Sequence, residues 1–304
     1  MDRHRLTQKI KAEAKSLGFD VCGIAKAEAV SKETITYYSH WTCDGKHGTM
    51  QYLERNCDKR FDPTVLVNGC RSIIVVALNY APRQGIEGIS RYAIGEDYHK
   101  IVKDKLYKLL GTIDAVIPTK GRAFCDSAPV LEKYWAVMAG IGWIGRNRQL
   151  TIPGKGSYFF LGELLIDREL EYDTPFTSNH CGNCNKCIEN CPTGALCKES
   201  FDARKCLSYL TIEHRGELPE NIGGKMGKCF YGCDRCLEAC PHNRFATPSS
   251  TPQFQPSDEL KQMKWKDWHS LTEEKYHKLF SRSAVERCGY RQLMRNISIM
   301  KTEN

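Results

Sequence analysis

Two stretches, Cys181-Gly-Asn-Cys184-Asn-Lys-Cys187-Ile-Glu-Asn-Cys191-Pro192 and Cys229-Phe-Tyr-Gly-Cys233-Asp-Arg-Cys236-Leu-Glu-Ala-Cys240-Pro241, hold eight of the sixteen cysteines of this chain. Three thiolates separated by two residues can each bind one corner of an iron-sulfur cubane. In two-cluster ferredoxins, a fourth cysteine followed by proline ligates the other cluster. Disulfides need an oxidising compartment, and zinc sites more often use two Cys-x-x-Cys pairs. The pattern therefore predicts two 4Fe-4S clusters and makes electron transfer the first functional hypothesis.

The same logic divides the cysteines between the two clusters. The predicted ligands of the first cluster are Cys181, Cys184, Cys187 and Cys240. Cys191 then crosses to the second cluster, where it joins Cys233, Cys236 and one further thiolate. Spacing nominates Cys229 as this eighth ligand, although three residues rather than two separate it from Cys233. The alternative is Cys206 in Ala-Arg-Lys-Cys-Leu-Ser, and residue spacing alone leaves the choice open.

Length and charge limit the class of protein. At 304 residues the chain can form one large domain or two of ordinary size. No apolar run follows the amino-terminal Met-Asp-Arg-His-Arg, and no eighteen apolar residues occur together. We expect a cytoplasmic protein without a membrane segment, because reducing conditions suit the remaining cysteines. The formal charge of +8 falls to about +4 once two cubanes of roughly −2 each are added, a mild basic bias that permits an RNA partner.

Helical and strand-like patterns alternate over about residues 1–170 and predict an α/β domain. Helical spacing runs from Leu6 to Leu17 and from Tyr98 to Ile113, and Ser31 is expected to cap a further helix. Strands are expected over residues 19–24, 71–80, 121–126 and 158–166. A helix from Pro129 to Gly140 is also expected, because proline is tolerated in a first helical turn.

The rest of the chain is expected to form two further parts. Residues 171–250 are predicted to be the domain that carries both clusters. Residues 251–304 are predicted to be a connector and a helical tail that packs on the core, since residues 246–256 are rich in proline and serine.

Asp126 lies at the end of a predicted strand, directly before a predicted helix. A carboxylate there commonly caps the helix by accepting hydrogen bonds from free backbone donors, and local chemistry favours this role. The alternative is a proton donor in a pocket at the carboxyl end of a strand, where open α/β sheets bind their ligands. Gly140, Gly142 and Gly145 follow a helix rather than a strand, so they do not indicate a dinucleotide-binding loop.

Several motifs together resemble the epoxyqueuosine reductase family, the cobalamin and iron-sulfur enzymes of queuosine synthesis in tRNA. The motifs are Ser90-Arg-Tyr-Ala, Asp97-Tyr-His99, Asp126-Ser-Ala-Pro-Val-Leu-Glu132, Gly142-Trp-Ile-Gly-Arg-Asn147, Phe160-Leu-Gly-Glu163, Cys187-Ile-Glu-Asn-Cys-Pro-Thr-Gly-Ala-Leu196, Cys206-Leu-Ser-Tyr-Leu-Thr-Ile-Glu213 and Tyr231-Gly-Cys-Asp-Arg-Cys236. Many ferredoxins share the cluster segment, whereas the Asp126 and Cys206 segments together are specific.

The resemblance implies a cobalamin-binding domain similar to nitroreductases, followed by a ferredoxin-like module with two 4Fe-4S clusters. In the implied reaction the epoxide oxygen of epoxyqueuosine leaves as water, after two electrons and two protons arrive. The resemblance selects Cys206 as the eighth cluster ligand, leaves Cys229 free and makes Asp126 the proton donor. An acid held against an apolar corrin is expected to have a raised pKa. Motif matches place Met50, Arg91, Asp126, Ser127, Tyr158 and Gly162 around the corrin.

The implied partners are tRNA with epoxyqueuosine in its anticodon loop and an unidentified electron donor, and a monomer is expected. Basic residues that are candidates for RNA contacts are Arg204, Lys205, Lys225, Lys228 and Arg235, with an ordinary solvated surface as the alternative. Two rival functions stay open. A reductive dehalogenase also combines a corrinoid with two clusters but resembles exported proteins with a twin-arginine leader, whereas a ferredoxin-type electron carrier would bind no cobalamin.

Overall fold

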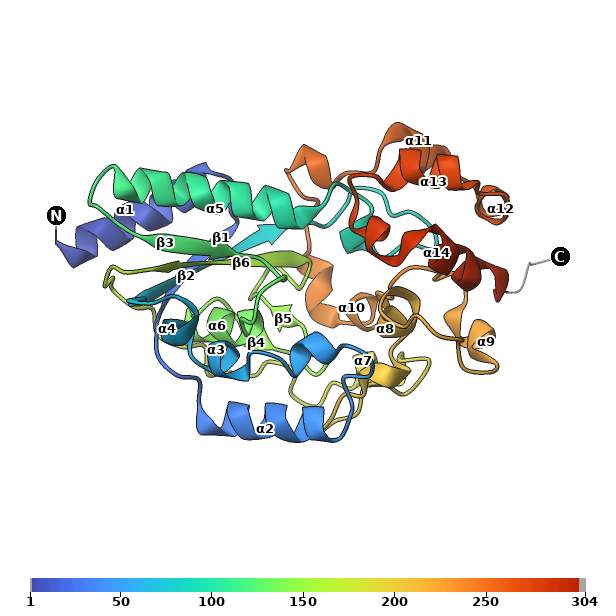
Figure 1. Cartoon of the computed structure of the whole chain (residues 1–304), viewed down its shortest axis with the longest axis horizontal. Helices are drawn as coiled ribbons and strands as arrows, with labels where there is room; N and C mark the ends of the chain where they lie inside the picture. The colour runs from blue at the N-terminus through green and yellow to red at the C-terminus, as the bar shows by residue number, and fades with distance from the viewer. Residues whose placement is uncertain (1, 301–304) are drawn as a thin grey trace.

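The computed structural model describes residues 2–300, and a mixed α/β unit occupies its amino-terminal part (Figure 1). The sheet at its centre has four strands in the order β1-β2-β6-β3, and all neighbouring strands are antiparallel. The strands are β1 (Val21–Lys26), β2 (Ser72–Asn79), β3 (Gly121–Phe124) and β6 (Phe159–Ile166). Each overlaps a predicted strand. Every residue of β2 is buried, as expected for a central strand that is covered on both faces.

Helices cover both faces of the sheet (Figure 1). On one face, α1 (Arg3–Ser16) and α5 (Tyr98–Asp114) pack in a core that contains Ile74. On the other face, α6 (Glu132–Met138) packs in a core that contains Val75. Neighbouring residues of β2 enter different cores because successive side chains of a strand point to opposite faces.

Short elements complete this unit. Between β1 and β2 lie α2 (Lys32–Cys43), the 3-10 helix η1 (Gln51–Leu53), α3 (Cys57–Phe61) and α4 (Pro63–Leu66). The 3-10 helix η2 (Arg91–Ala93) precedes α5, and a hairpin of β4 (Trp143–Ile144) and β5 (Leu150–Thr151) follows α6. The side chain of Ser31 accepts a hydrogen bond from the Thr34 amide at the start of α2, which confirms the predicted cap.

The helix expected from Pro129 begins later, at Glu132. Residues 125–131 instead form an irregular loop, in which the Ser127 amide donates to the Cys125 carbonyl and Asp126 has a left-handed φ of 57°. These local turns use backbone groups that a first helical turn would need, so the helix starts only after the loop. The prediction of the helix start was therefore wrong by three residues.

The cysteine-rich segment follows β6 and consists of short helices joined by loops. They are α7 (Lys186–Glu189), η3 (Ala203–Lys205), α8 (Leu207–Ile212), α9 (Ile222–Met226), α10 (Arg235–Glu238) and η4 (Pro241–Phe245). The helices α7 and α10 contact each other and contain the third cysteine of their runs, Cys187 and Cys236. The two cysteine runs thus have matching local structure.

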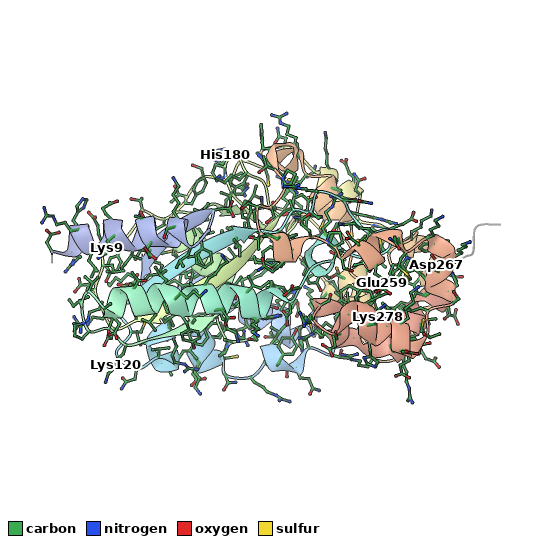
Figure 2. The ribbon with its side chains drawn as sticks, turned by 90° about the horizontal axis from the view of Figure 1, so that it is seen from above. Lys9, Lys120, His180, Glu259, Asp267 and Lys278 are labelled. Carbon is green, nitrogen blue, oxygen red and sulfur yellow. The ribbon has the colours of Figure 1, made fainter. Side chains whose placement is uncertain are left out.

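The carboxyl-terminal helices lie at the end of the molecule opposite the sheet (Figure 1). They are η5 (Pro252–Phe254), α11 (Asp258–Gln262), α12 (Trp265–His269), α13 (Glu273–Phe280), η6 (Ala284–Cys288) and α14 (Gly289–Ser298). In the view from above, Lys9 marks the end of the molecule with α1, and Lys278 marks the opposite end (Figure 2).

Polar side chains of α14 bind the cysteine-rich segment. The amide of Asn296, which is completely buried, donates to the carbonyls of Thr211 and Phe230, each at 2.9 Å. The amide of Gln292 donates to the carbonyls of Thr211 and Ile212. The last helix therefore connects α8 to the chain just before Cys233.

One core combines residues from all three predicted parts, within the ranges 86–94, 203–231 and 260–300. The boundaries at residues 170 and 250 accordingly stay a prediction. Within residues 2–300, none of the helices has the length and apolar character needed to cross a membrane.

Candidate active site and cluster cysteines

The four thiols predicted for the first cluster line one pocket that is partly open to solvent. They are Cys181, Cys184, Cys187 and Cys240, and His180, His242 and Arg146 also line the pocket. Burial, followed by Cys181 and Cys240, raises the pKa of the Cys187 thiol, as expected for sulfur atoms that lie close together. The structure therefore brings together thiols that lie 59 residues apart in the sequence, from residue 181 to residue 240.

The thiols predicted for the second cluster also lie near one another. Burial raises the pKa of Cys236, and Cys233 and Cys206 raise it further. Burial and Cys191 likewise raise the pKa of Cys206, which lies at the start of α8. Cys229 and then Cys206 contribute to the raised pKa of Cys233, but of these two only Cys206 is also among the leading causes of the raised pKa of Cys236. This pattern favours Cys206 as the eighth ligand, which stays a prediction.

The arrangement of the thiols is suited to a cage rather than to a single ion. Among the described residues, no three His, Cys, Asp or Glu side chains converge as ligands of one metal ion. A cubane instead needs thiolates spread around its corners. A pocket with a cysteine on several sides fits that requirement.

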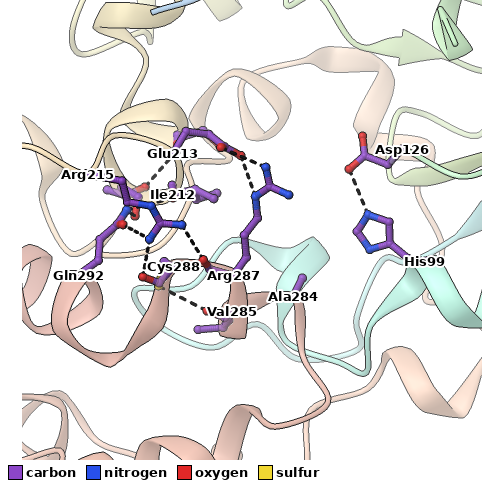
Figure 3. A network of polar contacts seen from close by, with 12 residues as sticks. His99, Asp126, Ile212, Glu213, Arg215, Ala284, Val285, Arg287, Cys288 and Gln292 are labelled. Atoms are coloured by element: carbon purple, nitrogen blue, oxygen red, sulfur yellow. Dashed lines mark hydrogen bonds and ion pairs between the residues drawn. The ribbon is translucent and has the colours of Figure 1, made fainter. Parts of the chain in front are cut away.

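Asp126 does not cap a helix, so the capping hypothesis was wrong. The residue before α6 is Leu131, and it makes no side-chain cap. The Asp126 carboxylate instead accepts a hydrogen bond from the Tyr98 hydroxyl at 2.7 Å and lies 3.3 Å from Nε2 of His99 (Figure 3). The tip of the β3–α6 loop is thus tied to the first turn of α5.

The antiparallel sheet explains the position of Asp126 differently from the rule used in the sequence analysis. The rule that locates ligands at strand ends belongs to parallel sheets, whereas here the sheet is antiparallel. Because β2 and β3 both run opposite to β6, their carboxyl ends lie at the same edge of the sheet. Asp126 lies at this edge, at the point where helices of the two faces, α5 and α6, both begin.

His99 carries the positive charge of the site. Its Nδ1 atom lies 2.6 Å from Oδ1 of Asp97, so that the ring stands between two carboxylates. Burial disfavours the charged ring, but the hydrogen bonds with Asp126 and Asp97 outweigh this cost and raise the pKa of His99 to about 9. Near neutral pH, His99 is therefore an imidazolium.

The pKa of Asp126 is lowered by its protein neighbours, whereas the expected rise concerns a carboxyl held against a corrin and stays a prediction. Burial opposes ionisation of Asp126, but hydrogen bonds from His99 and Tyr98 outweigh it. The side chain is 57% exposed, so the direct hydrogen bonds carry more weight than burial. The proton of this site accordingly belongs to His99, and Asp126 is the carboxylate beside it.

Two further carboxyl groups lie below Asp126. Oε1 of Glu132 accepts a hydrogen bond from the Asp126 amide. Burial, followed by Asp126, raises the pKa of Glu132 to about 7. Glu163 on β6 is completely buried, and burial together with Glu132 raises its pKa well above the ordinary range.

The residues expected around the corrin lie in different settings. Ser127 is exposed beside Asp126, and Met50 is partly buried against the carboxyl-terminal core. Arg91 lies 5.7 Å above the ring of the buried Tyr158 and pairs with Glu238 at 3.1 Å. These contacts form a wall of aromatic and cationic side chains.

Gly162 lies between β6 and α5 rather than at a surface. A Cβ atom there would approach Cγ1 of Val102 to 2.5 Å. This close contact explains the glycine by helix–sheet packing, so we leave Gly162 out of the proposed corrin-lining set.

Arg287 and Glu213 face the Asp126–His99 pair from the other side of the site (Figure 3). Nε of Arg287 lies 2.9 Å from Oε1 of Glu213, and the charge of Arg287 contributes to the lowered pKa of Asp126. Sequence analysis did not identify Arg287, because the carboxyl-terminal tail carries no motif around it. It quoted Tyr98, His99, Glu132, Glu163 and Glu213 only as parts of motifs.

Comparisons with known proteins agree on one family. The family model described as "Epoxyqueuosine reductase QueG, DUF1730" matches residues 60–127, and the 4Fe-4S double cluster binding domain matches residues 180–243. The epoxyqueuosine reductase of Cellulophaga algicola is 44% identical over 96% of this chain and 97% of its own length. That of Pseudomonas aeruginosa is 38% identical over 98% of this chain and 85% of its own length.

Solved structures agree with these sequence relatives. An epoxyqueuosine reductase with an epoxyqueuosine-modified tRNA stem loop has a TM-score of 0.86 and 27% identity, over 97% of this chain and 80% of that chain. The enzyme from Bacillus subtilis, with its catalytic aspartate loop swung out of the active site, has a TM-score of 0.85 and 28% identity, with the same coverage. A catabolic reductive dehalogenase shares the fold alone, with a TM-score of 0.51 and 19% identity over 80% of this chain and 32% of that chain.

The predicted α/β domain with a following two-cluster module is confirmed by these matches. Some of these relatives are more than 40% identical over nearly the whole chain, as in the Cyclobacterium marinum relative at 41% over 98% of this chain and 97% of its own length. The chain is therefore an oxidoreductase and belongs to the epoxyqueuosine reductase family.

Proposed function

We propose that this protein reduces epoxyqueuosine to queuosine in the anticodon loop of tRNA. Two electrons and two protons convert the epoxide to an alkene and release its oxygen as water. The observation that carries the proposal is the Tyr98–His99–Asp126 group, which holds a proton at a site open to solvent. Support for the substrate comes from the related structure with an epoxyqueuosine-modified tRNA stem loop.

The cofactors of the proposal are a cobalamin and two 4Fe-4S clusters. Bound cobalamin would supply the reducing centre, and the clusters would supply its electrons one at a time. In the proposal, Met50, Arg91, Asp126, Ser127 and Tyr158 line the corrin. The flat Tyr158 ring beneath the Arg91 guanidinium is suited to an apolar macrocycle that carries polar side groups.

The second set of thiols is proposed to be the one nearer the reaction. Burial lowers the pKa of the Lys133 ammonium, and Glu132, Asp126 and Cys236 act in the opposite direction. Cys236 therefore lies in the surroundings of the active site. The first set, by contrast, lies around a pocket with His180 and His242. Electrons from an external donor would therefore enter at the Cys181 set and leave from the Cys236 set.

Proton delivery is proposed to start at His99. Its imidazolium lies against Asp126, whose carboxylate extends into the solvent-accessible site. A proton moves from Nε2 of His99 to Asp126 as negative charge develops on the departing oxygen, and Asp126 donates it there. Tyr98 keeps the carboxylate oriented through its 2.7 Å hydrogen bond.

The proposed tRNA surface differs from the one expected by charge alone. Arg204 forms an ion pair with Asp202 at 2.8 Å, and Lys228 pairs with Glu87 at 2.9 Å. The Arg235 guanidinium donates to the Lys225 and Met226 carbonyls. These residues stabilise the cysteine-rich segment, which leaves Lys205 and the Lys225 ammonium as the proposed RNA contacts.

We propose that the protein acts as a monomer in the cytoplasm, where thiols stay reduced. Anaerobic reconstitution tests the cofactors. We expect about eight irons and one cobalamin per chain, whereas iron uptake without corrinoid would contradict the proposal and favour a ferredoxin-type carrier.

Nucleoside analysis of tRNA tests the substrate. Cells that lack this protein should accumulate epoxyqueuosine, and the purified enzyme with reductant should convert that tRNA to the queuosine form. Unchanged tRNA in both experiments would contradict the proposed substrate. Dehalogenation of a halogenated phenol by the same preparation would favour the dehalogenase alternative.

A further inference from the structure

Glu163 is a carboxyl group in the middle of the sheet without an evident partner. Its side chain is completely buried, and neither carboxylate oxygen makes a hydrogen bond of normal geometry within residues 2–300. Its register neighbours are Val75 on β2 and Phe124 on β3. A charged carboxylate in such surroundings is costly, so Glu163 is protonated or shares a proton.

Glu132 lies near Glu163 in the fold: α6 packs on β6, and Glu163 pairs in register with Phe124, two residues before the Asp126 amide that donates to Glu132. After burial, Glu132 has the largest effect on the pKa of Glu163 and raises it well above the usual range. Two carboxyl groups that lie together away from water do not both ionise, so one proton stays between them. The shared proton gives Glu163 a hydrogen-bond partner, which its carboxylate would otherwise lack.

Other charged groups around the pair are few. Asp126 and Cys125 face it from the β3–α6 loop, and Lys133 faces it from α6. The strands β1 and β2 contribute apolar residues to this core, including Ala25 and Val75. Lys133 is a poor counter-ion, because burial lowers its own pKa and its ammonium donates to the Arg148 carbonyl at 2.9 Å.

Glu132 connects the buried pair to the catalytic loop. Its Oε1 atom accepts the Asp126 amide proton, and Asp126 has a left-handed φ of 57° that a non-glycine residue adopts only with support. We propose that the Glu132–Glu163 pair is a positioning device for this loop, in which the shared proton fixes Glu132 and Glu132 holds the Asp126 amide. The effect of this pair on turnover rests on the proposed role of Asp126. The hydrogen bond between the Asp126 amide and Glu132 does not depend on that role.

Hydrogen–deuterium exchange of residues 125–131 in the reconstituted full chain tests the contact without substrate or cobalamin. Glu132→Ala should accelerate exchange about tenfold, because a hydrogen bond to a charged group is lost. Glu132→Gln retains an acceptor oxygen and should restore wild-type protection. Glu33→Ala is the matched control, since Glu33 occupies the first turn of another helix, α2. Slow hydrogen–deuterium exchange of the backbone amides of β2, the buried central strand, shows that each variant is folded.

The shared proton is tested by pH. In the wild type, protection of the loop should fall at alkaline pH, when the pair loses its proton. Glu163→Gln replaces that proton with an amide donor that does not titrate, so its loop should stay protected. The same pH dependence in both proteins would overturn the shared proton.

Two outcomes separate this inference from the proposed function. Wild-type exchange in Glu132→Ala, with β2 still protected, would overturn the positioning role whatever the turnover. Faster loop exchange with unchanged turnover would confirm the positioning role and contradict the catalytic role of Asp126. Should Glu132→Ala not fold, Glu163→Leu decides the same question, because it leaves Glu132 in place without its proton donor.

Discussion

Asp126 and His99 form a pair whose charge state is set by the side chains around it. Tyr98 and His99 stabilise the Asp126 carboxylate, and Asp97 with Asp126 stabilises the His99 imidazolium. A proton held between such partners is available near neutral pH, because neither group is forced into its neutral form. In the proposed mechanism, the acid of this site is therefore a pair of residues rather than a single carboxyl with a raised pKa.

Replacing Asp126 tests the proton-transfer role. Asp126→Asn should lower kcat by about 100-fold or more, because the amide cannot pass on a proton, while bound cobalamin and iron stay unchanged. Asp104→Asn is the matched control, since Asp104 is exposed on α5, the helix that begins with Tyr98 and His99. Single-turnover conversion of modified tRNA is the measurement, and equal rates for the two variants would contradict the role of Asp126.

The raised pKa of His99 predicts two pH effects. Turnover should fall as the pH rises through about 9, when the imidazolium loses its proton. The folded-state pKa exceeds the ordinary value of 6.5, so the stabilisation from His99 is complete below pH 6.5 and is lost as the pH rises toward 9. His99→Gln should remove both effects, and pH profiles of turnover and of thermal unfolding would measure them. If turnover of His99→Gln falls at the same alkaline pH as turnover of the wild type, a group other than His99 causes the fall.

The sequence supplied part of this site. Cysteine spacing and the position of Asp126 after a strand were visible in the chain, whereas capping and proton donation could not be told apart by local chemistry. Glu163 was visible within a motif but received no role, because its strand is otherwise apolar and Glu132 is distant in sequence. Arg287 reaches the site through tertiary packing, which no local pattern records.

At the scale of elements, apolar runs predicted the strands and the long helices well. Strand order and direction could not be predicted, since antiparallel pairing of β2 with β6 joins residues that are 80 to 94 positions apart in the sequence, from Asn79 with Phe159 to Ser72 with Ile166. The start of α6 was misplaced because a proline permits a helix but does not require one. Hydrogen bonds of Asp126 with Tyr98 and Glu132 instead fix the conformation of the loop before α6.

The contact between β6 and α5 predicts a stability difference between two glycine substitutions. Gly162→Ala should lower the free energy of unfolding by about 1–3 kcal/mol, because its Cβ would overlap Val102. Gly111→Ala on α5 meets no atom within 4 Å and should raise it by up to about 1 kcal/mol, since alanine favours the helix. Thermal unfolding of both variants is the measurement, and a stable Gly162→Ala protein with weakened cobalamin binding would instead indicate a corrin contact.

The start of α8 predicts which cysteine completes the second cluster. Cys206→Ala should remove the electron paramagnetic resonance signal of one reduced cluster and about four irons per chain. Cys229→Ala should leave both signals, because Cys206 rather than Cys229 is among the leading causes of the raised pKa of both Cys233 and Cys236. The reverse pattern would assign Cys229 as the ligand.

At the scale of the whole molecule, α14 joins segments that are distant in sequence. Asn296→Ala removes two buried hydrogen bonds and leaves the Thr211 and Phe230 carbonyls without partners. We expect a loss of about 2–4 kcal/mol in unfolding free energy and weaker retention of the second cluster. Ser298→Ala is the control, because Ser298 is exposed and bonds only to its own helix at Arg295. Cluster loss during dialysis under nitrogen would measure the effect, and equal loss in both variants would contradict it.

The position of α14 after all of the cluster cysteines also bears on how the protein is made. A ribosome releases Cys191, Cys206, Cys233 and Cys236 well before it releases Asn296, yet Asn296 binds the α8 segment to the chain before Cys233. The nascent chain therefore exposes these thiols before their final arrangement is secured. Delivery of iron and sulfide should then follow the synthesis of α14, and products truncated before Asn296 would be recognised by their failure to retain the second cluster.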